Sequence, residues 1–99
     1  MVRFVRRGTI KPGKLQPALA FANEIASYVK SKIGVDVNIF MQAGGVVGRI
    51  CWQTDYPDMG AVEKTNRELL TDQEFLKRVE AAADLFIQGD MRDSLWTQL

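Results

Sequence analysis

The sequence predicts an α+β domain in which an antiparallel four-stranded sheet carries its helices on one face. Apolar residues alternate through residues 2–10, 35–42 and 46–54, as they do in half-buried strands. Between the first two segments, apolar residues recur at three- and four-residue spacing, which is typical of a helix. A second helical region and a last short strand follow. The order βαββαβ is the ferredoxin-like arrangement.

Length and composition favour a single globular domain covering residues 1–99. The chain is 46% hydrophobic with a net charge of +1, which argues against disorder and against a dedicated nucleic-acid binder. No apolar run is long enough for a signal peptide or a membrane span. The one cysteine, Cys51, cannot form a disulfide within the chain. We therefore expect a cytoplasmic protein with no nucleic-acid or membrane partner.

Histidine is absent from the sequence. Zinc sites, histidine-ligated haem, and Ser-His-Asp or Cys-His catalytic units depend on it. We therefore expect no metal and no cofactor. Without a histidine to activate it, Cys51 is expected to be a core or interface residue rather than a nucleophile.

The first helix is expected from Lys14 to Ile33. Pro17 falls in its first turn, where a missing N–H costs nothing, and Gly34 is placed to be a left-handed C-terminal cap. The segment Ala43-Gly44-Gly45 is expected to form the tight turn between the second and third strands.

The second helix is expected to begin after Asp58, acting as N-cap, and to end near Leu70. Thr71, followed three residues later by Glu74, reads as a capping box that starts a third helix. That helix is predicted to continue through Phe86 and to end at Gly89. The last strand should span 91–97.

In this fold the usual spatial order of strands is 4-1-3-2, with both helical regions on one face. The parity of the apolar residues indicates which positions face the helices. These positions are Val2, Phe4, Arg6, Gly8 and Ile10 in the first strand, Val35, Val37, Ile39 and Met41 in the second, and Val46, Gly48, Ile50 and Trp52 in the third.

The opposite face of the sheet is too apolar for water and too polar for a simple core. A homodimer that packs two such faces together would cover the apolar groups and let the charged groups pair. The residues expected at this interface are Val5, Arg7, Asn38, Phe40, Val47, Arg49 and Cys51.

The chain resembles the dimeric α+β barrel superfamily. The features that carry the resemblance are the order of elements, the chain length, and the segments Lys11-Pro12-Gly13-Lys14, Gly44-Gly45, Thr54-Asp55-Tyr56 and Leu70-Thr71-Asp72. This superfamily includes antibiotic-biosynthesis-type monooxygenases and NIPSNAP-like proteins. The resemblance implies a dimer that pairs sheet against sheet, with a ligand pocket between sheet and helices.

In the monooxygenases that the chain resembles, polar and aromatic pocket residues position a phenolic substrate that itself activates oxygen. Asn38, Arg49 and Trp52 are residue types that such a site could use, although none matches a motif of that family one to one. Many members of the superfamily have no known activity.

Gly8 and Gly48 are both expected to face the helices, where each leaves side-chain volume empty. If the two glycines lie opposite each other, Phe4 lies opposite Trp52 and Arg6 opposite Ile50. The gap could form a pocket for a small organic ligand. Its lining would be Phe4, Arg6, Gly8, Tyr28, Gly48, Trp52 and Phe86.

The alternative is that large helix side chains such as Phe21, Tyr28 or Phe86 fill the gap. Arg6 should pair with an acid or an anionic ligand, or else extend to the edge of the sheet. The sequence thus leaves two functions open. The first is a small-molecule-binding or cofactor-free monooxygenase-like protein, and the second is a non-catalytic homodimeric interaction protein.

Overall fold

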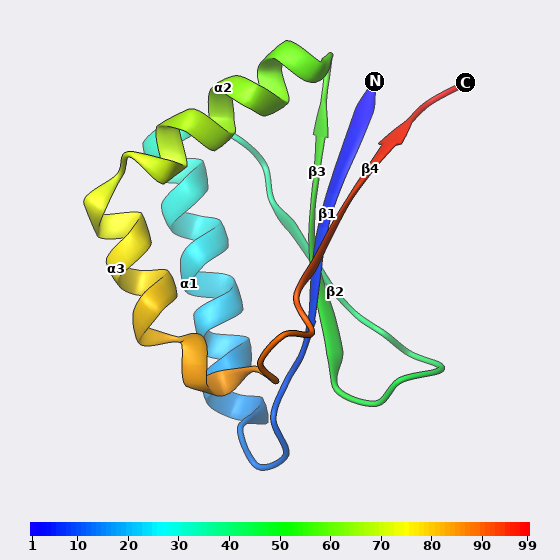
Figure 1. Ribbon diagram of the computed structural model, residues 1–99, viewed down its shortest axis with the longest axis vertical. Helices are drawn as coiled ribbons and strands as arrows, with labels where there is room; N and C mark the ends of the chain where they lie inside the picture. Colours follow the sequence, from blue (N-terminus) through cyan, green and yellow to red (C-terminus); the bar gives the residue numbers. More distant parts are fainter.

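The structure is a computed structural model that describes residues 1–99. Along the chain the elements are β1 (Val2–Thr9), α1 (Leu15–Ile33), β2 (Asn38–Met41), β3 (Arg49–Tyr56), α2 (Met59–Leu70), α3 (Gln73–Ala81), a 3₁₀ turn (Ala83–Leu85) and β4 (Arg92–Thr97). The strands form one antiparallel sheet in the order β2-β3-β1-β4. The helices cover one face and leave the other bare (Figure 1). The predicted ferredoxin-like topology and strand order are confirmed.

Helix α1 buries one narrow stripe of side chains against the sheet, as its spacing predicted. The buried residues are Ala18, Ala22, Ile25 and Val29. Gly34 caps the helix with a φ of 81°, and its N–H donates to the carbonyl oxygen of Lys30. No helix in the protein combines the length and the apolar character needed to cross a membrane.

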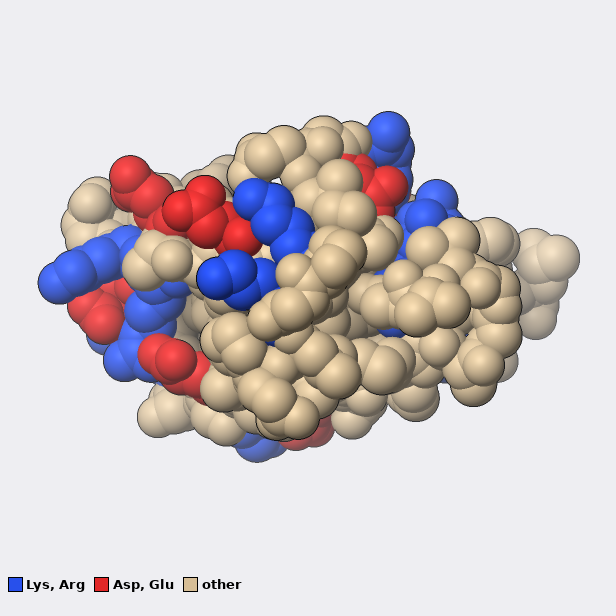
Figure 2. Space-filling view, turned by 90° about the horizontal axis from the view of Figure 1, so that it is seen from below, with Lys and Arg blue, Asp and Glu red and all other residues tan.

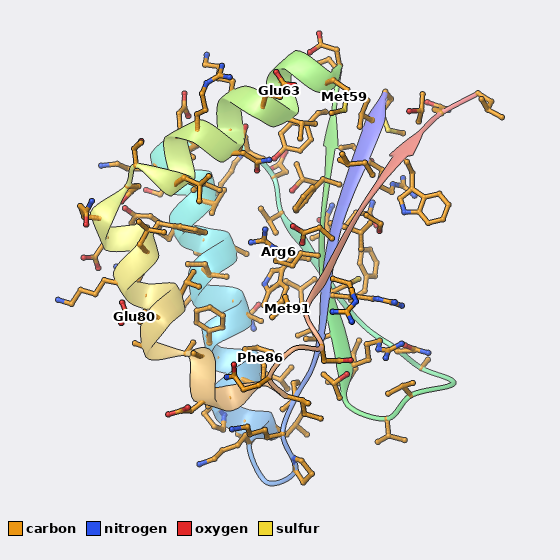
Figure 3. The ribbon with its side chains drawn as sticks, viewed as in Figure 1. Arg6, Met59, Glu63, Glu80, Phe86 and Met91 are labelled. Atoms are coloured by element: carbon orange, nitrogen blue, oxygen red, sulfur yellow. The ribbon has the colours of Figure 1, made fainter.

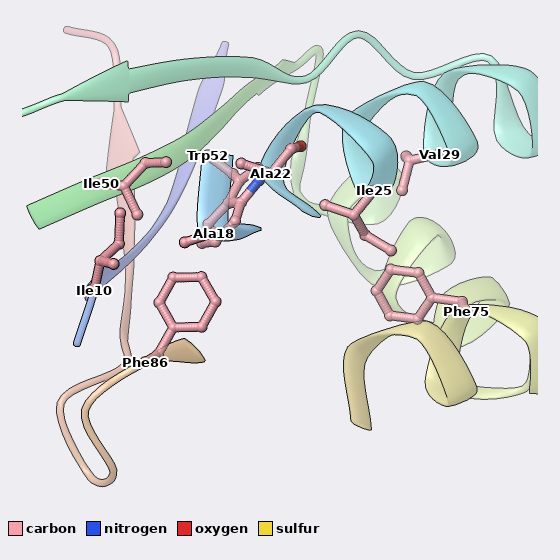
Figure 4. Close-up of a cluster of buried hydrophobic side chains, with 9 residues drawn as sticks. All are labelled: Ile10, Ala18, Ala22, Ile25, Val29, Ile50, Trp52, Phe75 and Phe86. Atoms are coloured by element: carbon pink, nitrogen blue, oxygen red, sulfur yellow. Dashed lines mark hydrogen bonds between the residues drawn. The ribbon is translucent and has the colours of Figure 1, made fainter. Parts of the chain in front are cut away.

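The main core lies where α1 packs on the centre of the sheet (Figure 4). Ile50 is almost fully buried, at 1% exposure. The rings of Phe21, Trp52 and Phe86 meet edge-on or tilted, with centroids 5.9 to 6.2 Å apart. The buried residues of the main core are Ile10, Ala18, Ala22, Ile25, Val29, Ile50, Trp52, Phe75 and Phe86, and Phe21 packs against them.

The faces of β1 and β3 are as predicted, but their register is not. Gly8 pairs with Ile50 and Arg6 with Trp52, so the predicted opposition of Gly8 to Gly48 is wrong by two residues. A shift of two residues keeps every side chain on its own face, because side chains alternate with a period of two. The predicted faces of β1 and β3 are therefore confirmed, whereas the predicted residue pairs between the two strands are wrong.

The predicted tight turn at Gly44-Gly45 is wrong, because a longer loop, residues 42–48, joins β2 to β3. Gly48 has a φ of 81°, which lies outside the extended region of a regular strand, and its carbonyl oxygen accepts a hydrogen bond from the N–H of Ile10. Val46 and Val47 therefore lie exposed in the loop, at 43% and 91%, rather than in β3.

Aspartates cap the N-termini of both α2 and α3. Asp58 caps α2 as expected, since its carboxylate accepts from the N–H of Ala61. The predicted cap at Thr71 is wrong by one residue, because the carboxylate of Asp72 accepts from the N–H of Phe75. The hydroxyl of Thr71 instead donates back to α2, to the carbonyl oxygen of Arg67.

The third helix ends at Ala81 rather than near Gly89. Two backbone hydrogen bonds join the following residues to the end of β1 and the segment just after it. The N–H of Lys11 donates to the carbonyl oxygen of Leu85, and the N–H of Ile87 donates to the carbonyl oxygen of Thr9. These bonds replace the last helical turns and turn Phe86 into the core, where it is 5% exposed.

Candidate functional site

A cavity of about 130 Å³ lies between the sheet and the helical layer. It is lined by 16 residues, of which 12 are hydrophobic. These residues are Phe4, Arg6, Phe21, Ile25, Ala26, Val29, Val37, Trp52, Thr54, Tyr56, Thr65, Asn66, Leu69, Phe75, Val79 and Met91. A concave, mostly apolar site with a few polar groups is the usual form of a small-molecule site.

Two regular spacings build the wall of this cavity. In β3, Trp52, Thr54 and Tyr56 share one face because side chains alternate along a strand. In α1, Ile25 and Val29 stand one turn apart on the buried stripe.

Arg6 lies on the helix side of β1 and faces the space under the helices, with Met91 beside it (Figure 3). Its Nε and Nη2 donate to the two carboxylate oxygens of Asp93 on β4, at 2.7 and 2.9 Å. Its guanidinium also lies 5.5 Å from the centre of the Phe4 ring. The two hydrogen bonds raise the pKa of Arg6 above its ordinary value, against the effect of burial. Of the alternatives left open for Arg6, the structure shows the pair with an acid.

Arg6 is the charged residue of the cavity wall, and Asp93 pairs with it from outside the lining. The side chains of Arg6 and Asp93 are 42% and 46% exposed, so the pair is accessible to solvent. Asp93 occupies Nε and Nη2, while Nη1 makes no hydrogen bond within the protein. Arg6 can therefore still donate a hydrogen bond to a molecule in the cavity.

A second polar group lies around Tyr56, where β3 meets α2. Thr54 and Thr65 are 5% and 6% exposed, and Tyr56 is 7% exposed. Burial raises the pKa of the Tyr56 hydroxyl, while hydrogen bonds with Thr65 and Thr54 oppose that effect. These hydroxyl groups give the cavity a neutral polar patch apart from Arg6.

Three of the predicted pocket residues, Phe4, Arg6 and Trp52, line the observed cavity. Gly8 does not border open space, because a Cβ built on it would stand 2.9 Å from the sulfur of Met91. Gly48 lies in the β2–β3 loop and has no place in the cavity wall.

Phe86 and Tyr28 have other roles. Phe86 packs against Trp52 and supports it from the side of the core. The hydroxyl of Tyr28 donates to both carboxylate oxygens of Asp72, at 2.8 and 2.9 Å, and the guanidinium of Arg78 lies 4.7 Å from its ring. Tyr28 thus ties α1 to the start of α3.

Sequence reasoning missed the inward-facing threonines. Thr54 continues the parity of Ile50 and Trp52, so its place on the helix side could have been read from the strand pattern. Thr65, on α2, is the other buried threonine of the wall. Polar residues at positions that should be core were the available signal.

The residues predicted for a dimer interface lie on or beside the bare face of the sheet. Phe40 is 52% exposed and Val47, in the β2–β3 loop, is 91% exposed. Trp96 of β4, paired with Arg3 and 63% exposed, shares this face and was not predicted. No three carboxylate or thiol side chains converge in a way that could hold a metal ion.

Comparison with solved structures identifies the fold. An uncharacterized NIPSNAP domain protein from Burkholderia xenovorans superposes with a TM-score of 0.84 at 12% identity, covering 100% of this chain and 95% of that one. Protein Atu4242 from Agrobacterium tumefaciens gives 0.82 at 16% identity, covering 100% and 94%. A structure described as an antibiotic biosynthesis monooxygenase gives 0.75 at 15% identity, covering 100% and 99%.

The protein therefore has the ferredoxin-like α+β fold shared by NIPSNAP and antibiotic-biosynthesis-monooxygenase proteins, and the resemblance inferred from its sequence is confirmed at the level of the fold. No protein-family model and no curated protein matches the sequence.

Proposed function

We propose that the protein binds a small, mostly apolar organic molecule in the cavity between its sheet and its helices. The observation that carries the proposal is the lining itself, 12 hydrophobic residues of 16 around a space with a guanidinium at its rim. An apolar cavity of about 150 Å³ can hold benzene. A volume of about 130 Å³ therefore suits a molecule built on a single ring.

The polar groups of the wall restrict that molecule further. Asp93 already neutralises Arg6, so a carboxylate ligand would have to compete with a bidentate partner. An uncharged ligand with one acceptor oxygen could use the free Nη1 without breaking the ion pair. Phenols and cyclic ketones have this chemistry.

Filling the cavity tests the proposal. Ala26 lines the cavity on α1, whereas Ala20 lies on the exposed side of the same helix. With phenol as the probe, titration followed by heteronuclear NMR should show saturable shifts in Trp52 and Thr54. Ala26→Leu should abolish these shifts, and Ala20→Leu should leave them unchanged. Equal shifts in both variants would show that phenol binds elsewhere, and the proposal would fall.

A monooxygenase-like reaction in the same cavity is the finer form of the proposal. It is supported by the printed name of one protein that shares the fold, the antibiotic biosynthesis monooxygenase. The measurement is oxygen uptake with a panel of phenols and quinols, using the Ala26→Leu variant as the control. Uptake that persists in this variant would count against chemistry in the cavity.

A second candidate function is that of a non-catalytic homodimer whose sheet faces pack together. It is favoured by large apolar side chains on the bare face, among them Phe40 and Trp96. Light scattering at micromolar concentration should give the mass of two chains. Phe40→Asp should yield a monomer, whereas Leu70→Asp, at a 68% exposed position on α2, should not. A wild-type monomer would refute this candidate.

A further inference from the structure

Three arginines lie together at one end of the bare sheet face. Arg7 of β1 pairs directly with Arg92 of β4, and its neighbour on the same face of β1, Thr9, pairs with Arg49 of β3. Side chains directly opposite on neighbouring strands stand about 5 Å apart, and diagonal ones about 7–8 Å. Three long guanidinium side chains can therefore reach one small molecule. In the view from below, basic and acidic side chains lie together beside the uncharged β2–β3 loop (Figure 2).

These arginines lack the partners that the other strand arginines have. Arg3 and Arg6 each form two hydrogen bonds with one aspartate. None of the three arginines in the cluster takes part in an ion pair.

The polar atoms of the cluster are only partly satisfied within the protein. Nη1 of Arg92 donates to the carbonyl oxygens of Gly89 and Met91, at 2.7 and 3.0 Å. The Nε of Arg49 is buried and has no hydrogen-bond partner. A buried donor without an acceptor is costly, so an acceptor that reached the Arg49 guanidinium would remove this cost.

Asp90 is the acidic residue of this end of the sheet. Its carboxylate accepts a hydrogen bond from the hydroxyl of Thr9. That bond lowers the pKa of Asp90, and the charges of Arg49, Arg92 and Arg7 lower it further. One carboxylate faces three guanidinium groups, so the cluster keeps a positive excess.

Like charges directly opposite on neighbouring strands destabilise a sheet. An oxyanion would reverse that effect, because guanidinium groups present paired donors that match the oxygens of a phosphate. We propose that Arg7, Arg49 and Arg92 form a binding site for a phosphate group, carried by inorganic phosphate or by a phosphate monoester. The site is separate from the cavity under the helices and does not depend on its ligand.

The test is titration with inorganic phosphate at constant ionic strength, followed through the arginine Nε–Hε NMR signals. Saturable shifts are expected in wild type. Arg49→Gln should weaken binding by about tenfold or more, because it removes charge-assisted hydrogen bonds. Arg67→Gln, which removes an exposed arginine of α2 outside all ion pairs, should bind as wild type does. Should Arg49→Gln fail to fold by circular dichroism, Arg92→Gln takes its place.

A parallel titration with glycerol phosphate distinguishes the two sources of the group. Tighter binding than inorganic phosphate identifies a monoester as the ligand, and equal binding assigns recognition to the phosphate alone. Shifts that chloride reproduces at the same ionic strength, or equal weakening in Arg67→Gln, would overturn the proposal. Light scattering on the same samples shows whether phosphate binds to one chain or to two.

Discussion

Phe86 offers a sharp test of how the wall of the cavity is supported. Its ring is 5% exposed and meets those of Trp52 and Phe21 at centroid distances of 5.9 and 6.1 Å. Phe86→Ala would cost about 3–5 kcal/mol, which could exhaust the stability of a small domain. Phe86→Leu is the better perturbation, because it keeps most of the apolar bulk and removes two ring contacts. Each contact contributes about 0.5–1.5 kcal/mol beyond burial, so the expected loss is about 1–3 kcal/mol.

Urea unfolding followed by circular dichroism measures this loss. A Trp96→Phe background leaves Trp52 as the only tryptophan, so that selectively excited tryptophan emission reports on the cavity wall in the same experiment. The emission of Trp52 should shift to the red in Phe86→Leu as its packing loosens. The matched control is Ile87→Ala, at a 43% exposed neighbouring position, which should change stability by less than about 0.5 kcal/mol.

A loss below about 0.5 kcal/mol in Phe86→Leu would refute the reasoning, because surface substitutions reach that size. The contacts of Trp52 with α1, among them the indole N–H 3.4 Å from the carbonyl oxygen of Ala22, would then be enough to position its ring.

Three further predictions concern caps, pH and glycines. Asp72→Ala should lower the melting temperature more than Thr71→Ala, because Asp72 caps α3; equal losses would restore Thr71 as the cap. Hydrogen bonds from the first turn of α3 and from a tyrosine hydroxyl lower the pKa of Asp72 below its ordinary value of 3.8. The carboxylate therefore stabilises the folded protein fully above pH 3.8, and this stabilisation is lost as the pH falls through the lowered pKa. The urea midpoint should therefore fall on acidification, and less steeply in Asp72→Asn. Gly48→Ala, at a φ of 81°, should destabilise the fold more than Gly8→Ala, where only the flexible end of Met91 has to move; the reverse order in urea unfolding would contradict this.

The order of elements and of strands could be predicted from the sequence because the patterns that indicate them are local. The stripe of α1, its Gly34 cap and the Asp58 cap each depend on residues within a few positions of one another. The end of α3 depends instead on bonds to β1, which lies more than seventy residues away in the chain. No local pattern around Gly89 could have revealed those bonds.

The candidate site could be predicted only in part, for a related reason. Parity fixes which face a side chain occupies, so Phe4, Arg6 and Trp52 could be assigned to the helix side. Parity does not fix the register between β1 and β3, and in the structure Gly48, with its positive φ, lies in the β2–β3 loop rather than in β3. The β1–β3 register differs by two residues from the predicted one, and the side chain of Met91 covers Gly8, so Gly8 does not border the cavity.

The two sides of the sheet differ in how their arginines are balanced, and this difference separates the two proposals. On the helix side Arg6 is matched by Asp93, so the cavity presents a neutral rim and favours an uncharged ligand. At the end of the bare face Arg7 and Arg92 lie opposite each other with no ion pair, so that surface favours an anion. A single ligand class is therefore not expected to occupy both. Phosphate should leave the Trp52 signals unshifted, and phenol should leave the Arg49 signals unshifted. A probe that shifted both sets would show that the sites are coupled and that charge balance alone does not set their preference.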